Sequence, residues 1–339
     1  MGVRMADVAA HAGVSEATVS RVLNAKAGVA AETRQAVLTA MDVLGYERPS
    51  RLRTRSAGLV GLIVPELENP IFPAYAQVIE TILAQNSYTP VLCTQTPGGV
   101  PEDEYVEMLL DRDVAGIIFV SGLHADTHAS HDRYHSLRKR GLPIVLVNGF
   151  VPGLDAPFIS NDDATSIELA VNHLASLGHQ RIGLAVGPER FVPAARKIES
   201  FRRVMHTLFG DAAAPVAASF YTVEGGGASA VQLLDAGCTG IVCGSDLMAL
   251  GAIRAVRGRG LHVPRDVSVL GYDDSPLIAF TDPPLTTVRQ AVLPMGKAAV
   301  QALIAEISGT EVPRTEFMFA PELVVRGSTA AVVMRPAAT

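Results

Sequence analysis

Short apolar runs separated by amphipathic stretches recur along most of this chain, and this alternation constrains the fold more than any other feature. From residue 59 onward the runs read LVGLIV, VLCT, VAGIIFV, PIVLV, RIGLAV, GIVCG and VSVLGY. Buried parallel strands have this continuous apolar character, and the intervening helical patterns are typical of βαβ units. One doubly wound sheet cannot house so many strands with their helices. We therefore predict two α/β lobes, with a ligand bound beyond the carboxyl ends of their strands.

Length and composition fit a globular protein. A chain of 339 residues with 48% hydrophobic residues predicts two or three domains. No apolar run approaches the roughly 18 residues that span a bilayer, and the first residues lack the apolar core of a signal peptide. We expect a cytoplasmic protein with no membrane partner. Cys93, Cys238 and Cys243 lack a CxxC spacing, which favours buried thiols over a disulfide or a zinc site.

Charge is distributed unevenly along the chain. The net charge is -6, which by itself argues against a nucleic-acid partner. Through residue 58, however, eight basic side chains stand against five acidic ones, while the remainder carries 20 basic and 29 acidic residues. A small basic head on a large acidic body places any polyanionic partner at the head.

The head has the pattern of a helix-turn-helix. Residues 5–12 predict a short helix with Val8 and Ala9 facing inward, and Gly13 allows a sharp turn. Ser15 is a suitable N-cap for a second helix from Glu16 to about residue 23, with an inward stripe of Val19, Val22 and Leu23. The second helix of such a motif enters the major groove. Its outward side chains, the candidates for reading base edges, are Glu16, Ala17, Ser20 and Arg21.

A third helix completes the head. Residues 32–44 place four apolar side chains on one stripe, and Gly45 stands where a C-cap glycine belongs. The members of that stripe are Val37, Leu38, Met41 and Leu44. From spacing alone an ordinary helical hairpin without DNA-binding activity remains an alternative of about equal weight.

The exact string is more specific than the spacing. DVAAHAGVSEATVSRVLN, followed by ETRQAVLTAMDVLGY, resembles the head of the LacI/GalR family of bacterial repressors almost position by position. The resemblance implies that Glu16, Ala17 and Arg21 contact bases. It also implies backbone contacts from side chains whose hydroxyl, amide or phenol groups suit phosphate oxygens. These are Ser15, Thr18, Asn24, Thr33 and Tyr46.

The segment ERPSRLRTRSAG, residues 47–58, is rich in Arg and lacks hydrophobic periodicity. In the family this segment carries a hinge helix that folds on DNA and inserts a Leu into the minor groove. Here it looks about four residues shorter than the usual pattern, which leaves Leu52 as the wedge candidate. A flexible basic tether that contacts phosphates non-specifically is an equally weighted alternative.

The body carries further landmarks of the same family: ENPIF, LGHQRIGLAVGP, GSDLMALGA, VPRDVSVLGYDD and PPLTTVRQ. The resemblance implies a body similar to the periplasmic sugar-binding proteins, with three crossovers between its lobes and a last strand near residues 322–326. We predict a DNA-binding domain at 1–46, a hinge at 47–58, an effector-binding and dimerisation domain at 59–330, and a tail at 331–339. The predicted N-lobe takes 59–160 and 290–320, and the C-lobe takes 161–289 and 321–330.

Residues at predicted strand ends are the effector candidates. A polyhydroxyl ligand needs side chains that donate and accept hydrogen bonds, together with an aromatic wall. The candidates, which match effector positions of the family, are Phe72, Asn148, Arg196, Ser245 and Asp273. For Arg196 and Asp273 a ligand contact is favoured over a structural salt bridge. Asp246 is interpreted as a cap of the following helix, and Ser245 departs from the Asp or Asn usual in the family.

The sequence gives little support for a metal site, a phosphate loop or a catalytic site. Four histidines at helical spacing could suggest zinc, but interleaved Asp residues and the absence of HExxH favour a solvated helix face. The histidines are His124, His128, His131 and His135. The glycines at 225–227 precede a predicted helix without a phosphate-loop pattern, and no catalytic motif is present. We expect no enzyme activity, no cofactor and no metal.

These observations predict a transcriptional repressor that binds operator DNA as a homodimer and is controlled by a small-molecule effector, a sugar. The tail has no leucine heptad, so nothing in it supports a tetramer. Two alternatives stay open: a sugar-binding protein without regulatory DNA binding, which the body alone would allow, and a sugar-modifying enzyme.

Overall fold

The computed structural model describes residues 3–23, 28–46, 57–95, 98–210 and 214–332. The chain divides into two compact units. One comprises residues 1–57 with 85–87, and the other comprises 58–84 with 88–339. Among the described residues no helix is long and apolar enough to cross a membrane.

The head contains three described helices: α1 (Met5–His11), α2 (Glu16–Leu23) and α3 (Ala31–Leu44). Ser15 caps α2 as predicted, because its Oγ accepts a hydrogen bond from the backbone N–H of Thr18 at 3.2 Å. Gly13 and Gly45 have φ of +66° and +63°, the left-handed conformation that each of these turns requires. Gly45 is the C-cap of α3.

One small core holds these helices together. It consists of Val8, Ala9, Val19, Val22, Val37, Ala40 and Tyr46. The predicted stripe of α3 was wrong at one position: Leu38 is 46% exposed, and Ala40 takes the buried place. At helical spacing the two residues lie on different faces, and it is the face of Ala40 that belongs to the core of the head.

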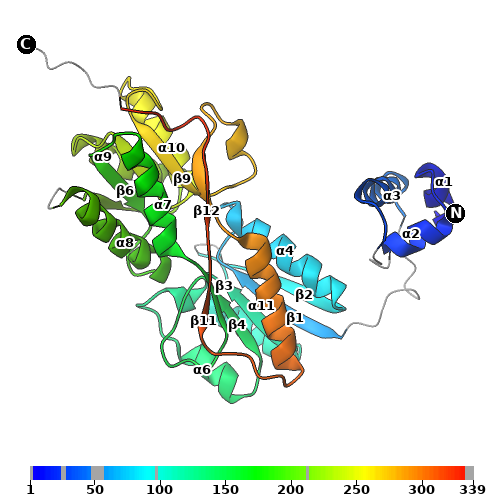
Figure 1. Cartoon of the computed structure of the whole chain (residues 1–339). Coiled ribbons are helices and arrows are strands. Elements are labelled where there is room, and N and C mark those ends of the chain that lie inside the picture. The colour runs from blue at the N-terminus through cyan, green and yellow to red at the C-terminus, as the bar shows by residue number, and fades with distance from the viewer. Residues whose placement is uncertain (1–2, 24–27, 47–56, 96–97, 211–213, 333–339) are drawn as a thin grey trace, which may run out of the picture. The chain divides into compact units, whose positions relative to one another are not determined.

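The first sheet of the body has the strand order β11-β5-β4-β3-β1-β2, and all its described pairings are parallel. Its strands are β1 (Gly58–Val64), β2 (Tyr88–Thr94), β3 (Gly116–Val120), β4 (Ile144–Val147), β5 (Phe158–Asn161) and β11 (Glu316–Phe319). Helices α4 (Ile71–Gln85) and α11 (Val292–Ile307) pack on one face, and α5 (Glu102–Leu110) and α6 (Asp132–Lys139) pack on the other (Figure 1). We call this half the first lobe.

The second sheet has the order β12-β10-β9-β8-β6-β7, and only the β10–β12 pairing is antiparallel among those described. Its strands are β6 (Ile182–Val186), β7 (Val216–Ala218), β8 (Gly240–Cys243), β9 (Ser268–Asp273), β10 (Thr286–Arg289) and β12 (Glu322–Val324). Helices α7 (Asp163–Ser176) and α8 (Val192–Phe209) cover one face, and α9 (Val223–Asp235) and α10 (Asp246–Gly258) cover the other. We call this half the second lobe.

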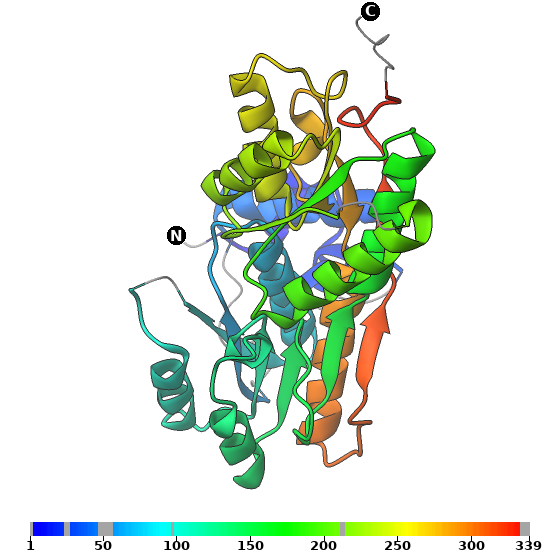
Figure 2. The same cartoon turned by 90° about the vertical axis from the view of Figure 1, so that its left-hand side faces the viewer.

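The two lobes are joined by crossings of the chain that lie after β5, after β10 and after β11 in the described residues. Figure 2 shows the two lobes one above the other, with the strands of the first sheet pointing toward the second lobe. All seven apolar runs are strands, as predicted. Four strands of three or four residues, β5, β7, β10 and β11, were not predicted from the sequence, and all of them except β7 include polar residues. Strands this short contain too few residues for a pattern to emerge.

The glycines at 225–227 do not precede a helix, as the sequence analysis had it, but lie inside the first turns of α9. A Cβ at Gly226 would overlap the backbone carbonyl of Met248, and a Cβ at Gly251 would overlap that of Val223. Gly226 and Gly251 therefore serve the close approach of α9 to α10, whereas Gly225 lies against the backbone of Phe220.

Candidate DNA-reading head and effector site

The predicted reading face of α2 is accessible. Glu16, Ala17 and Arg21 are exposed, while Val19 and Val22 on the opposite face are buried in the core of the head. This division follows from the helical period, because residues three or four apart share a face. The exposed face can offer a carboxylate, a methyl group and a guanidinium to the base edges of DNA.

The predicted phosphate contacts differ in their surroundings. Ser15 is exposed, and Thr18 and Thr33 are half-buried. Tyr46 is only 8% exposed and belongs to the core of the head, so little of it is available to a phosphate. Asn24 and the wedge candidate Leu52 lie outside the described residues, as does most of the predicted hinge.

A group of buried and half-buried polar side chains lies between the two lobes, where strands of both sheets end. We call it the polar cluster. It comprises Tyr75, Asn148, Asn161, Asp163, Lys197, Tyr272, Asp273 and Gln290. Both lobes contribute to it, because parallel strands end at one edge of a sheet and these two edges face each other.

Asp273 is the most constrained member of the polar cluster. It ends β9 with φ of +118°, a strained conformation for a residue with a side chain, and it is 5% exposed. One carboxyl oxygen accepts a hydrogen bond from Gln290 Nε2 at 2.6 Å, while Oδ2 is buried with no hydrogen-bond partner in the described structure. Burial, reinforced by the nearby charge of Asp246, raises the pKa of Asp273 well above its usual range.

The first lobe supplies Tyr75 and Asn148. The hydroxyl of Tyr75 donates to Gln290 Oε1 at 3.0 Å, and a side-chain hydrogen bond also joins Tyr75 to Asn148. Burial raises the pKa of Tyr75, so this phenol stays protonated. Asn148 follows β4 with φ of +62°. Phe72, predicted as an aromatic wall, is half-buried in the first turn of α4 and packs partly against the core of its own lobe.

A buried ion pair in the polar cluster was not predicted from the sequence. Lys197 Nζ contacts Asp163 Oδ1, both residues are at most 4% exposed, and the ammonium also lies 4.1 Å from the centre of the Tyr272 ring. Tyr272 donates to Asp163 at 3.3 Å and accepts from Asn161 Nδ2 at 2.7 Å. The available signals were polar residues directly after β5 and a lysine next to the predicted Arg196.

Arg196 does not stand free. It lies in the second turn of α8, and its two terminal nitrogens donate to the two carboxyl oxygens of Glu316, each at 2.8 Å. The sequence analysis favoured a ligand contact over a salt bridge, and the structure contains the salt bridge. Its partner was missed because Glu316 lies in β11, one of the strands that the sequence did not reveal. The contact with a ligand stays a prediction.

The helix cap that was predicted at Asp246 is made by Ser245 instead. Ser245 is the N-cap of α10, and its Oγ accepts from the backbone N–H of Met248 at 3.2 Å. Asp246 does not cap the helix as interpreted, because its carboxyl accepts from the backbone N–H of Ser275 and the hydroxyl of Thr287, each at 2.7 Å. Burial raises the pKa of Asp246 to about 6.

The interpretation of the four histidines as one solvated helix face was wrong, because only His135 lies in an α-helix, where it is exposed, and His124 is buried. His124 is fully buried in a 3-10 turn (Leu123–Ala125), where its Nε2 lies 3.1 Å from the carbonyl oxygen of Val147. Burial lowers its pKa to about 3. Among the described residues no group of His, Cys, Asp or Glu is arranged to hold a metal ion.

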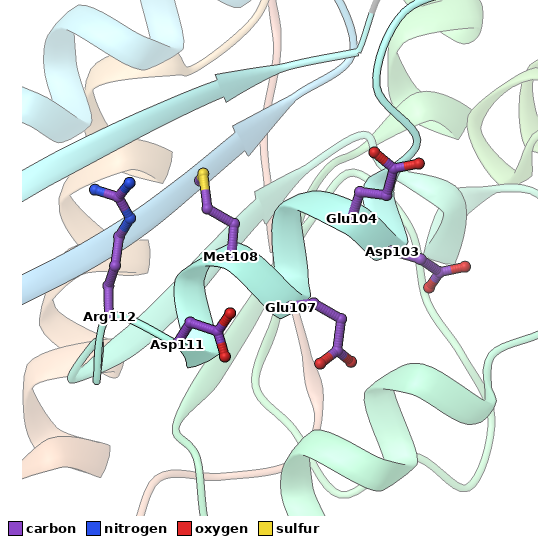
Figure 3. Close-up of a pocket in the computed structure, with 6 residues that line it drawn as sticks. All are labelled: Asp103, Glu104, Glu107, Met108, Asp111 and Arg112. Carbon is purple, nitrogen blue, oxygen red and sulfur yellow. The ribbon is translucent and has the colours of Figure 1, made fainter.

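A depression of about 490 Å³ lies elsewhere, along α5 (Figure 3). Four acidic side chains line it together with Met108 and Arg112; they are Asp103, Glu104, Glu107 and Asp111. All six residues project from one helix and the turn that follows it, and none belongs to the predicted sites.

Comparisons with known proteins agree with this geometry. Residues 4–49 match the model of the bacterial regulatory proteins of the lacI family, and residues 171–329 match a periplasmic binding protein-like domain. The chain is 65% identical over 335 residues to the HTH-type transcriptional regulator MalR of Streptomyces coelicolor, covering 97% of each chain. The chain belongs to the LacI family.

Solved structures of related regulators match the fold of this chain over nearly its full length. The complex of the regulator CelR with cellobiose is 28% identical, with a TM-score of 0.73 over 96% of this chain and 99% of that one. The lac repressor dimer bound to operator is 29% identical, with a TM-score of 0.71 over 98% and 100%. This LacI-family chain is therefore a transcriptional regulator with a helix-turn-helix head and a two-lobed body.

Proposed function

We propose that the head reads operator DNA through Glu16, Ala17 and Arg21. The observation that carries the proposal is the accessibility of these three side chains on a helix whose other face is buried in the head. Arg is the commonest reader of guanine, Glu can accept from a cytosine amino group, and Ala can contact a thymine methyl. Ser15, Thr18 and Thr33 add contacts to the DNA backbone.

The effector, a small polyhydroxyl compound such as a sugar, binds at the polar cluster. Asn148 and Asp273 are its principal contacts, with Arg196 beside them and Ser245 as a buried neighbour. The unpartnered oxygens of Asp273 and Asn161 support this assignment, because buried acceptors without a donor are costly unless a ligand or water supplies one. A related regulator, CelR, is known in complex with cellobiose.

The protein acts as a homodimer that places two heads on the two halves of a pseudo-palindromic operator. Its organisation is the one set out from the sequence, with a DNA-binding domain at 1–46, a hinge at 47–58 and a body at 59–330. Effector binding changes the orientation of one lobe relative to the other, and this change alters the affinity of the head for DNA. The coupling is reciprocal, so DNA changes the affinity for effector by the same factor by which effector changes the affinity for DNA. The protein performs no catalysis.

A gel-shift experiment tests this function. Labelled DNA from upstream of the chain's own gene is titrated with the full chain, alone and with cellobiose and other neutral sugars. We expect a retarded band at nanomolar protein that one of the sugars weakens or strengthens, with no such band on scrambled DNA of equal length. Equal binding to both DNAs would contradict operator reading, and a band that no sugar in the panel changes would contradict a sugar effector.

A further inference from the structure

Basic side chains in and beside the polar cluster are all neutralised in the described structure. Each of five has a carboxylate within ion-pair distance. The pairs are Arg190 with Asp126, Arg196 with Glu316, Lys197 with Asp163, and Arg289 and Arg326 with Asp274. A site that binds phosphate or carboxylate normally offers a cation that no carboxylate already neutralises. Among the residues described, none of these five cations is without a carboxylate partner.

The ion pair between Arg196 and Glu316 joins the two lobes. Arg196 belongs to α8 of the second lobe, and Glu316 is the first residue of β11 in the first lobe. The geometry is bidentate, with both N–O distances 2.8 Å, and the side chains are 28% and 14% exposed. The Glu316 hydrogen bonds raise the pKa of Arg196, which keeps the guanidinium charged and matched by one carboxylate. Asp163 of the polar cluster adds its charge to this effect.

An anionic ligand would therefore meet two costs. It would lose its water without gaining an unpaired cation, and it would stand beside the carboxylates of Glu316 and Asp163. A neutral ligand meets neither cost. Its hydroxyl groups can donate to the unpartnered oxygen of Asn161 and can bond with the carboxyl of Asp273.

We propose that Glu316 is a specificity-determining residue, which neutralises Arg196 and so restricts the effector site to uncharged polyhydroxyl ligands, with sugar phosphates excluded. This inference rests on the proposed effector site and names the class of compound that it accepts. Glu316 acts through Arg196 and is a positioning residue. Removing its charge while keeping its shape should convert Arg196 into a bidentate donor for a phosphate group.

The test compares thermal unfolding midpoints of four full-length proteins with glucose 6-phosphate or glucose, at constant ionic strength. The proteins are wild type, Glu316→Gln, the double variant Glu316→Gln with Arg196→Met, and the control Glu168→Gln. Glu168 pairs with Arg203 at 2.8 Å on α7 and α8, and both side chains are about half exposed, so the control releases an arginine outside the polar cluster. Binding of phosphate to the head would shift the unfolding midpoint of all four proteins alike. The measured quantity is therefore the difference between the ligand-induced shift of each variant and that of wild type.

We expect Glu316→Gln to bind glucose 6-phosphate at least about tenfold more tightly than wild type, the size of one charge-assisted hydrogen bond. The double variant and Glu168→Gln should match wild type, and the response to glucose should change less than the response to its phosphate. Circular dichroism checks that each variant is folded.

Two results would overturn the proposal. One is a folded Glu316→Gln protein that gains no affinity for glucose 6-phosphate. The other needs no Glu316 variant: a saturable response of wild type to glucose 6-phosphate that Arg196→Met abolishes would mean that anions bind with Glu316 in place. Neither measurement uses DNA. A failure of sugar-dependent operator release, which would remove the proposed function, is thus distinguishable from a failure of charge selection.

Discussion

At the scale of single residues, burial decides what the carboxyl groups between the lobes can do. Asp246 and Asp273 are both buried within the second lobe, and the desolvation of each raises its pKa. Asp163 is also buried and also has a raised pKa, although Lys197 opposes that shift. Because the pKa of Asp273 is raised well above its usual range, this carboxyl group favours its protonated form, which can donate a hydrogen bond to a neutral hydroxyl.

This burial predicts a pH-dependent stability. The folded protein raises the pKa of Asp246 from 3.8 to about 6, so it binds this proton more tightly than the unfolded chain does. The stabilisation is fully present below about pH 4 and is lost as the pH rises through about 6.

The variant Asp246→Asn tests this prediction, because its side chain cannot titrate. Urea unfolding at pH 4.5 and 7.5 should show a smaller loss of stability for Asp246→Asn than for wild type, by about 2 kcal/mol. Glu168→Gln, whose side chain is 44% exposed, serves as control, and equal losses in Asp246→Asn and wild type would contradict the prediction.

A second residue-scale prediction concerns Arg21. Its side chain is exposed on α2, and we expect it to contact a base rather than only a phosphate. Arg21→Ala should weaken operator binding by roughly 1 to 3 kcal/mol and relax the preference at one base pair, while binding to random DNA changes little. Fluorescence anisotropy with the operator, single-base variants and random DNA measures both effects. An equal loss on all these DNAs would identify Arg21 as a phosphate contact.

At the scale of elements, the packing of α9 on α10 depends on the absence of side chains. Gly226 on α9 and Gly251 on α10 each face the backbone of the other helix. Glycine weakens a helix by about 1 kcal/mol relative to alanine, so its use here is explained by the close approach of the backbones and not by helix propensity.

Two substitutions in the same helix separate these effects. Gly251→Ala places a methyl group against the carbonyl of Val223 and should destabilise the protein by about 1 to 3 kcal/mol. Gly258→Ala in the last turn of α10 meets nothing within 4 Å and should be neutral or stabilise by at most about 1 kcal/mol. Urea unfolding of both variants measures the difference. Similar stabilities for the two would show that α9 and α10 can move apart without cost.

At the scale of the whole molecule, the two lobes also touch through residues that are not members of the polar cluster. The backbone N–H and the hydroxyl of Thr127 in the first lobe both donate to the carbonyl oxygen of Arg190 in the second, each at 2.8 Å. The Arg190 side chain donates to Asp126 at 2.8 Å. Because effector contacts in this proposal come from both lobes, any bond that joins the lobes favours the arrangement that binds effector.

Arg190→Ala tests this coupling. The ion pair is partly exposed, so we expect the free energy of unfolding to fall by less than about 1 kcal/mol. The sugar concentration for half-maximal effect in the gel-shift should nevertheless rise by about two- to fivefold, because the joined arrangement becomes less populated. Arg203→Ala removes an ion pair within the second lobe and is the matched control. An unchanged sugar response in Arg190→Ala would mean that this contact does not take part in the effector response.

The amino-acid sequence by itself determined several features that depend on neighbours along the chain. The seven apolar runs are strands, and Arg21 lies on the exposed face of α2. Ser15 caps the beginning of α2 and Gly45 caps the end of α3, as their chemistry requires. Only the tertiary structure decided which side chains meet across large separations, such as Arg196 with Glu316, or Asn161 with Tyr272. It also decided that His124 is buried. Local patterns report periodicity and capping, whereas the pairing of distant charges and the burial of a polar group depend on how the lobes pack.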